Sequence, residues 1–337
     1  MVGEKMRPVR LVLYGVGPIG SNVVKVLEKK DWVQISGAID TDDSKVGKDL
    51  GEVAGLGHKL DVAVSRDAIG VLAASSPDIV VHATSSYVQD VCPQILECVD
   101  AGADVVSTSE ELTYPYVKHP DLADKIDKSA KMHDVTVLGT GVNPGFVMDA
   151  LAVVLSGVCQ TIKSVRVERV VDTSKRRWQL QRKTGAGLSS IEFRRLVKEG
   201  KIKHVGLPES AMMIGAALGW RLDQVQEEIT PIISKKRVRA EYALVKKGNV
   251  AGVHQVARGT VAGQERIVLD LKMYAGAGDP HDSIKINGVP PIDMTIRGGV
   301  QGDLATAAIV SNAIPNVISS TPGLKTMIDL PIIHNIA

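Results

Sequence analysis

The chain has few cysteines and few aromatic residues. Only three of its 337 residues are cysteines, Cys92, Cys98 and Cys159. Their spacing fits neither a paired disulfide framework nor a zinc site, so we expect buried or half-buried thiols in a reducing cytoplasm and no metal. With 44% hydrophobic, 23% charged and 3% aromatic residues, the composition is typical of a globular protein, and the length suffices for two domains.

The chain also lacks an excess of charge of one sign and a long apolar run. A formal net charge of +2 leaves no broad basic surface, which argues against nucleic acid as a partner. No apolar segment reaches the length of a membrane span, and the basic N-terminus has no apolar signal-peptide core. We therefore expect a cytoplasmic protein that binds neither nucleic acid nor a membrane.

The clearest motif lies near the start of the chain. An apolar run, Leu11–Tyr14, ends in Gly15-x-Gly17-x-x-Gly20 and is followed by an amphipathic helical pattern. The first glycine makes a tight turn, the second lets the backbone approach a pyrophosphate, and the third lets helix and strand pack closely. Asp40 ends a second apolar run and is placed to bind ribose hydroxyls. This predicts a dinucleotide at Gly15, Gly17, Pro18, Ile19, Gly20, Asp40 and Thr41.

The first 145 residues alternate between strand and helix patterns. The expected strands are Leu11–Tyr14, Val33–Ile39, Leu60–Val64, Asp78–Ala83, Asp104–Ser107 and Thr136–Leu138. The expected helices between them are Ser21–Lys29, Asp67–Ala74, Val88–Ala101 and Leu122–His133. Such alternation predicts a parallel sheet with right-handed crossovers, which binds its ligands beyond the carboxyl ends of the strands.

From residue 146 onward, strands and helices follow one another without strict alternation. The expected elements are the helices Phe146–Cys159, Ser189–Glu199, Pro208–Gly219 and Asp303–Ile314, and the strands Val165–Val171, Tyr242–Val245, Gln255–Val261 and Arg266–Met273. We expect Pro315 to stop the last helix and Gly302 or Asp303 to cap it. The predicted fold class is α/β, with an N-terminal Rossmann domain (1–145), an α+β domain (146–301) and a C-terminal helix and tail (302–337) that pack back on the first domain.

Candidate catalytic carboxylates follow the fifth expected strand. The segment Ser107-Thr-Ser-Glu110-Glu111 lies where a Rossmann sheet faces the nicotinamide. A carboxylate there can act as general acid or base on an amine or a hydroxyl. Alternatively, the pair caps the following helix. Because neighbouring side chains diverge, we expect only one of the two to point into the cleft.

Two other loops are expected at the cofactor. After the fourth strand, the backbone at Ala83 and Thr84 is placed to pass the ribose and the nicotinamide, whereas His82 is expected to be a packed strand residue. In the glycine-rich segment 139–145, Asn143 can offer its amide to the nicotinamide carboxamide, or the segment is an ordinary turn. The cofactor-binding residues predicted in these loops are Ala83, Thr84, Ser85, Ser107 and Asn143.

A basic cluster marks the second region. Its members are Arg169, Arg176, Arg177, Gln181, Arg182 and Lys183. Such a cluster either binds a substrate carboxylate or forms a solvated face.

Several segments together resemble one family. They are Tyr14-Gly-Val-Gly-Pro-Ile-Gly20, Ser107-Thr-Ser-Glu110-Glu111-Leu, Gly139-Thr-Gly-Val-Asn143-Pro-Gly-Phe146-Val-Met-Asp149 and Thr321-Pro-Gly-Leu-Lys-Thr-Met. They are similar to the 2,4-diaminopentanoate dehydrogenase family, which includes native NAD(P)-dependent amine dehydrogenases and shares the fold of dihydrodipicolinate reductase. The paired histidines of that reductase are missing after Asn143, which disfavours its reaction.

The resemblance implies reductive amination of a small ketone with ammonia, and the reverse deamination. It matches the family's catalytic glutamate best to Glu110, with Glu111 as the alternative in register. It also implies a homodimer, with residues 146–301 serving substrate binding and dimerisation. Together with position in the sequence, it gives a substrate pocket lined by Val142, Val147, Met148, His254 and Thr306.

Two other classes remain open. One is a different Rossmann oxidoreductase, of the dihydrodipicolinate reductase, semialdehyde dehydrogenase or homoserine dehydrogenase type. The cysteine or lysine that the last two need stands neither after the fifth strand nor at Asn143. The other is a non-catalytic NAD(P)-binding regulator, against which the surroundings of Glu110 argue.

The segment after the second strand bears on the choice of cofactor. Asp40 favours NAD because its charge repels a 2′-phosphate. Thr41, Ser44 and Lys45 can accept that phosphate if Asp40 turns away. We predict that NAD is preferred and NADP tolerated.

Overall fold

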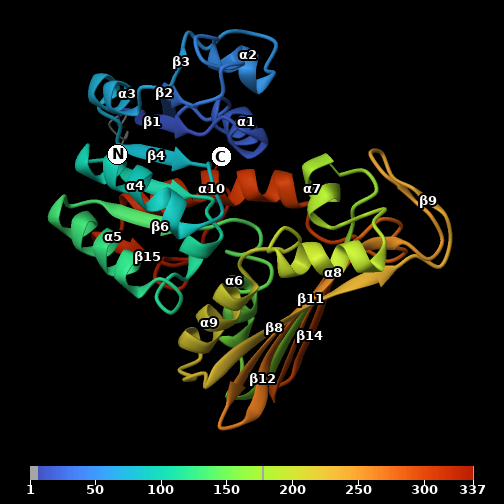
Figure 1. Cartoon of the computed structure of the whole chain (residues 1–337). Helices are drawn as coiled ribbons and strands as arrows, with labels where there is room; N and C mark the ends of the chain where they lie inside the picture. Colours follow the sequence, from blue (N-terminus) through green and yellow to red (C-terminus); the bar gives the residue numbers. More distant parts are fainter. Residues whose placement is uncertain (1–6, 177, 337) are drawn as a thin grey trace. The chain divides into compact units, whose positions relative to one another are not determined.

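The computed structural model describes residues 7–176 and 178–336, which form two compact units (Figure 1). The first unit holds the described residues up to Phe146 and those from Gln301 onward, and the second holds Val147–Val300. No helix among the described residues has both the length and the apolar character needed to cross a membrane.

The first unit is built on a seven-stranded sheet in the order β15-β6-β5-β4-β1-β2-β3, in which all paired strands are parallel. Its strands are β1 (Val9–Tyr14), β2 (Val33–Ile39), β3 (Val64–Ser65), β4 (Ile79–His82), β5 (Asp104–Ser107), β6 (Thr136–Gly139) and β15 (Gly323–Lys325). Every residue of β4 and β6 is buried, as expected for parallel strands covered on both faces.

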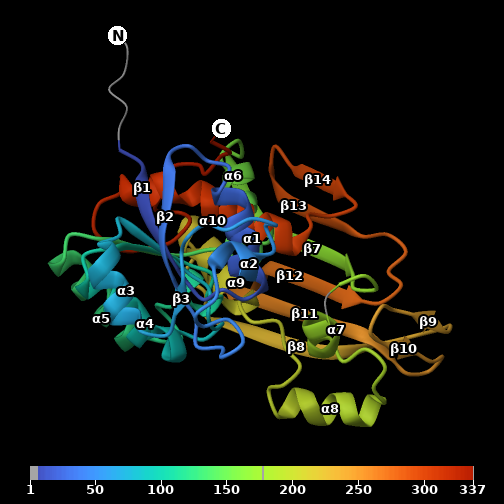
Figure 2. The same cartoon turned by 90° about the horizontal axis from the view of Figure 1, so that it is seen from above.

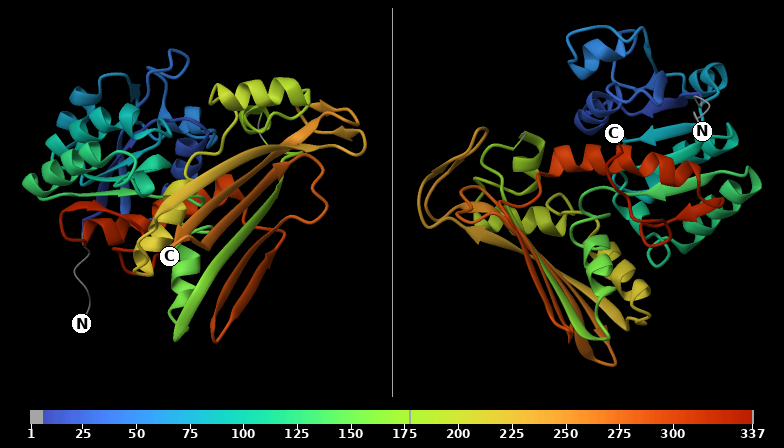
Figure 3. Two further views of the ribbon diagram at one scale, coloured as in Figure 1. Left: turned by 60° about the horizontal axis from the view of Figure 1, so that its bottom comes forward. Right: turned by 180° about the vertical axis from the view of Figure 1, so that it is seen from behind.

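Helices cover both faces of this sheet. They are α1 (Pro18–Leu27), α2 (Leu50–Ala54), α3 (Ala68–Ser75), α4 (Val88–Asp100), α5 (Pro120–Met132) and α10 (Gly302–Ile318), and a 3₁₀ turn, η1, spans Glu111–Thr113. Leu11 and Leu13 of β1 pack with α1 and α10 on one face, and Val12 packs with α3, α4 and α5 on the other. Figure 3 shows α10, drawn in red, lying across the sheet.

The second unit contains a six-stranded mixed sheet in the order β14-β13-β7-β12-β11-β8, which Figure 2 shows side by side. The strands are β7 (Thr161–Asp172), β8 (Gln224–Ile233), β11 (Val250–Val261), β12 (Gln264–Tyr274), β13 (His281–Val289) and β14 (Ile292–Arg297), and β9 (Val238–Arg239) and β10 (Leu244–Val245) form a separate pair. Its helices are α6 (Ala150–Ser156), α7 (Trp178–Lys183), α8 (Ser190–Lys198) and α9 (Leu207–Ala217). The predicted fold class, a parallel Rossmann sheet with an α+β domain, is confirmed.

The bounds of several predicted elements differ from the structure. The strand expected over Tyr242–Val245 is reduced to β10, because the Tyr242 N–H donates to the side chain of Gln181 and not to a neighbouring strand. The helix expected over Phe146–Cys159 begins only at Ala150, because the Asp149 carboxylate accepts the Ala150 N–H and caps it. The strand expected over Leu60–Val64 is reduced to Val64–Ser65, because Asp49 binds the N–H groups of Leu60 and Val62. Pro315 does not stop the last helix, which continues to Ile318. The N-cap position of this helix is Gln301 rather than Gly302 or Asp303, and the Gln301 side chain makes no capping hydrogen bond with the described residues.

Candidate functional site

Five strand ends lie in one row across the first unit. Tyr14 of β1 pairs with Ile39 on one side and with His82 on the other, His82 pairs with Ser107, and Ser107 pairs with Gly139. The loops that follow these five residues therefore open at the same edge of the sheet. This edge brings together the glycine turn, Asp40, the Glu110 turn and the Asn143 turn.

The glycine turn is tightly packed around its first and third glycines and open at its second. Gly15 has φ +100°, and a Cβ there would lie 2.5 Å from the carbonyl oxygen of Ala83. A Cβ on Gly20 would lie 2.1 Å from the carbonyl oxygen of Gly15, whereas a Cβ on Gly17 would meet no described atom within 4 Å. The first and third glycines thus serve packing, and the second leaves room for a ligand to approach the backbone.

Helix α1 starts directly from this turn. Gly17 is its N-cap, and Pro18 and Ile19 are its first two residues. No side chain among the described residues caps this N-terminus, which leaves first-turn N–H groups available to an anion.

The Asp40 carboxylate is held at the end of β2. Its two oxygens accept the N–H groups of Val16 and Asp42, each at 2.9 Å, and the Lys45 ammonium at 2.8 Å. Partial burial opposes ionisation of Asp40, but the bonds to Lys45 and to the two N–H groups outweigh it and keep its pKa below the ordinary value. Asp40 is therefore ionised, with a cation beside it. Thr41, the next residue, is exposed.

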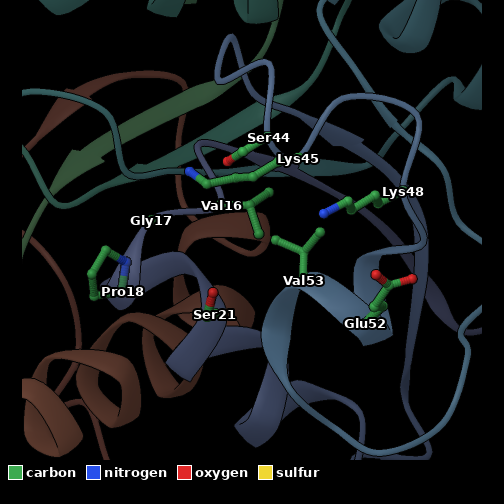
Figure 4. Close-up of a pocket in the computed structure, with 9 residues that line it drawn as sticks. All are labelled: Val16, Gly17, Pro18, Ser21, Ser44, Lys45, Lys48, Glu52 and Val53. Atoms are coloured by element: carbon green, nitrogen blue, oxygen red, sulfur yellow. The ribbon is translucent and has the colours of Figure 1, made fainter.

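A cavity of about 390 Å³ opens beside the glycine turn (Figure 4). Its lining residues are Val16, Gly17, Pro18, Ser21, Ser44, Lys45, Lys48, Glu52 and Val53. Two lysines and two serines around a helix N-terminus fit a phosphate-bearing ligand. Gly17, Pro18, Ser44 and Lys45 were expected near the cofactor, whereas Lys48, Ser21 and Glu52 were not. The segment Lys45-Val-Gly-Lys48 could have indicated Lys48 as a second cationic residue of the cavity, since it sets two lysines close together on one loop.

The two glutamates after β5 have different surroundings. Glu111 is only 2% exposed, and its carboxylate accepts the Val88 N–H and binds the side chains of Lys118 and His119. These contacts tie the loop to the start of α4, which makes Glu111 structural. Glu110 is half-buried at the head of η1. Of the two, Glu110 is the better placed to meet a ligand.

Asn143 lies in the turn after β6, and both polar atoms of its side chain are buried. Neither has a hydrogen-bond partner among the described residues. A buried amide without a partner is costly unless a ligand satisfies it, so the side chain fits the carboxamide of a nicotinamide. Next to it, the Val142 N–H donates to the Thr306 hydroxyl at 3.3 Å, which brings two predicted pocket residues together.

Other predicted cofactor residues have partners within the first unit. The Thr84 hydroxyl donates to Gln94 at 2.6 Å, and the Ser85 hydroxyl donates to Asp90 at 2.7 Å. Ser107 is fully buried, and its hydroxyl lies 3.0 Å from His82 Nδ1. Contacts of these side chains to a cofactor stay predictions. His82 is fully buried, as expected of a packed strand residue.

The remaining predicted pocket residues belong to the second unit. Val147 and Met148 have no exposed surface. His254 lies on β11, where its Nε2 is 2.8 Å from the Asp270 carboxylate of the neighbouring strand β12. A substrate contact of any of the three stays a prediction.

The basic cluster of the second unit is not one solvated face. Arg169 is 3% exposed, and its guanidinium donates to both oxygens of Asp282 at 2.7 Å and to the Val300 carbonyl. Gln181 is also buried and donates to three carbonyl groups of the loop before α7. Both side chains are therefore structural. Arg177 lies outside the described residues.

Comparison with known proteins agrees with this arrangement. Residues 146–337 match the family of 2,4-diaminopentanoate dehydrogenase C-terminal domains, and residues 9–109 match the N-terminal part of dihydrodipicolinate reductase. The chain is 34% identical to 2,4-diaminopentanoate dehydrogenase from Acetoanaerobium sticklandii, over 97% of this chain and 94% of the relative.

Proteins named amine dehydrogenase are also similar to this chain. The amine dehydrogenase of Streptomyces virginiae is 25% identical over 95% of this chain and 96% of its own. The solved structure of amine dehydrogenase from Mycobacterium smegmatis matches with a TM-score of 0.86 at 30% identity and covers 97% of each chain.

The glycine turn on a parallel sheet, together with these relatives, defines a Rossmann-type oxidoreductase of the class that uses NAD or NADP. Within that class, the chain belongs to the 2,4-diaminopentanoate dehydrogenase family.

Proposed function

We propose that this protein is an NAD(P)-dependent amine dehydrogenase. Its reaction would be the reductive amination of a small ketone with ammonia, and the reverse oxidative deamination of the amine. The names of its relatives support this reaction. The observation that carries it is the half-buried carboxylate of Glu110 at the strand-end edge that also holds the glycine turn and Asn143.

Three groups of this chain would hold the cofactor. The turn at Gly17 and the N-terminus of α1 would receive the pyrophosphate, Asp40 the adenosine ribose, and Asn143 the carboxamide. When bound, the nicotinamide supplies the hydride of the reaction.

Glu110 would handle the proton. Its carboxylate takes a proton from ammonium, and the amine so formed attacks the ketone to give a carbinolamine. The protonated Glu110 then returns this proton to the carbinolamine hydroxyl, which leaves as water. The product is an iminium cation, which the regenerated carboxylate stabilises. Since this cation forms only along the reaction path, a carboxylate beside it lowers the barrier more than it strengthens substrate binding.

Substitution of each glutamate in turn tests the assignment. Glu110→Gln removes the proton acceptor and keeps the shape, so we expect the kcat of amination to fall about 10²–10⁴-fold with an unchanged Kd for NADH. Glu111→Gln is the matched control, in which we expect a lower Tm and a kcat within about tenfold of wild type. Near wild-type turnover of Glu110→Gln would contradict the role of Glu110.

We propose NAD as the preferred cofactor, with NADP tolerated. Asp40, which is ionised, disfavours a 2′-phosphate, while Lys45 at 2.8 Å and Lys48 in the same cavity wall offset part of that repulsion. A strong preference for NADP in kcat/KM would contradict the role of Asp40.

We further propose that the protein is a homodimer in the cytoplasm, as its family resemblance implies. The mass of the protein in solution, measured by light scattering, tests the dimer, and the mass of a monomer would contradict it.

A further inference from the structure

Two buried polar side chains, His82 and Ser107, connect the end of β4 to the turn that carries Glu110. His82 and Ser107 are register partners on adjacent strands, both are fully buried, and His82 Nδ1 lies 3.0 Å from Ser107 Oγ. On its other side, His82 Nε2 lies 2.8 Å from Gln94 Oε1 and 3.0 Å from the Thr84 hydroxyl. Burying a histidine at the end of the otherwise apolar strand β4 is costly unless both ring nitrogens are bonded, as they are here.

The partners determine where the protons are. Gln94 Oε1 can only accept, so Nε2 carries the hydrogen and Nδ1 has a free electron pair. The Ser107 hydroxyl therefore donates to Nδ1, which leaves the Ser107 oxygen to accept the Ser109 N–H at 3.2 Å. Burial lowers the pKa of His82 to about 4, so the imidazole is neutral at pH 7 and keeps this direction of bonding.

The hydrogen bond from the Ser109 N–H to the Ser107 hydroxyl bears on Glu110, because it holds the turn in which Glu110 lies. Ser109 precedes Glu110, and its carbonyl accepts the Leu112 N–H of η1 at 3.1 Å. Flanking residues are held by the backbone: the Thr108 N–H donates to the His82 carbonyl at 2.9 Å, and the Glu111 N–H to the Ser86 carbonyl at 3.1 Å. Between these anchors, the Ser107 hydroxyl is the side-chain group that holds the Ser109 N–H.

We propose that His82 is a positioning residue, which fixes the turn carrying Glu110 by orienting the Ser107 hydroxyl toward the Ser109 N–H. The inference rests on the proposed function only in so far as Glu110 handles the proton. His82 itself touches neither substrate nor cofactor in this role.

Two substitutions of His82 separate its two nitrogens. In His82→Asn, the amide can place its oxygen near the position of Nδ1 and accept from Ser107, while the bond to Gln94 is lost. In His82→Gln, the longer amide can reach Gln94, but a methylene replaces Nδ1, so Ser107 loses its acceptor. Ser107→Ala removes the same bond from the other side with His82 intact, so the test does not depend on the folding of one variant.

The first readout is hydrogen exchange of the Ser109 amide in the full-length protein, which needs no turnover. We expect His82→Gln and Ser107→Ala to exchange about tenfold faster than wild type, and His82→Asn to stay close to wild type. Equal exchange of the Ser109 amide in His82→Gln and His82→Asn would overturn the inference.

The second readout is the kinetics of amination. We expect the kcat of His82→Gln to fall about tenfold with KM for NADH within about threefold of wild type, and His82→Asn to restore kcat. A wild-type kcat in His82→Gln, or equal losses in both variants, would overturn the positioning role. Failure of the proposed function looks different: Glu110→Gln would then keep its turnover, while the exchange of Ser109 would still depend on His82.

Discussion

Glu110 and Glu111 are neighbours in the sequence but differ in what surrounds them. Glu111 is buried against Val88, Lys118 and His119, whereas Glu110 is half-buried at the edge of the sheet. The sequence predicts that only one of the pair points into the cleft, because adjacent side chains diverge. The family resemblance favours Glu110, but the residue pattern alone does not say which of the two it is, since the burial of Glu111 depends on a contact with Val88, 23 residues earlier in the sequence.

The lysines of the cavity beside the glycine turn give a prediction about cofactor choice. In Lys45→Met, Asp40 loses its cation, so its charge repels a 2′-phosphate more strongly. We expect KM for NADP to rise about tenfold and KM for NAD to change less than about threefold, with a smaller effect of the same kind in Lys48→Met. Steady-state kinetics with both cofactors measure this.

Lys25→Met is the matched control for charge. Lys25 lies in the last turn of α1 and not among the cavity's lining residues. The same change in KM for NADP in Lys25→Met would mean that net charge alone is responsible, which would contradict a local role of Lys45.

His82 also gives a prediction about stability and pH. Burial lowers its pKa from the ordinary 6.5 to about 4. Between these values the unfolded chain binds a proton that the folded chain does not, so stability is lost as pH falls through this window. From near pH 7 to near pH 4.5, wild type should lose about 2 kcal/mol more free energy of unfolding than His82→Asn. Urea unfolding of both proteins tests this, and equal losses would refute it.

At the scale of elements, local signals and tertiary packing compete in α10. Pro315 lacks the N–H that would bond the Ser311 carbonyl, which favours an end to the helix. The helix nevertheless continues, because Val317 beyond the proline is fully buried in the core between α1 and the sheet. Packing of the last turn thus outweighs the lost hydrogen bond.

This explanation of α10 can be tested at its last turn. Val317→Ala should lower the free energy of unfolding by about 2 kcal/mol, because it removes fully buried methyl groups. Ile318→Ala, at a side chain that is 38% exposed, should cost less than about 1 kcal/mol. Equal costs in urea unfolding would mean that burial of Val317 does not hold the helix end.

Most elements of the first unit could be predicted from the sequence, because buried parallel strands are continuous apolar runs between amphipathic helices. β2 and β5 have the predicted bounds. β8 was not predicted, because its first half is polar and it contains Pro231. It lies at the edge of its sheet, where a proline is tolerated. β15 has only three residues and gives no periodic signal.

At the scale of the whole molecule, the candidate site combines segments that the sequence shows separately. The glycine turn, Asp40 and the two loops after β5 and β6 could be predicted, because parallel strands end at one edge of their sheet. The bond between His82 and Ser107 could not, since it depends on the register of two strands. The unsatisfied amide of Asn143 likewise appears only once its surroundings are packed.

The reaction itself is tested most directly by the oxidation of NADH and NADPH with a panel of small ketones, with and without ammonia. An amine dehydrogenase with Glu110 as its proton acceptor should oxidise the cofactor only when both the ketone and ammonia are present, and the product should be the amine. Turnover of a ketone at the same rate without ammonia would contradict the proposed function.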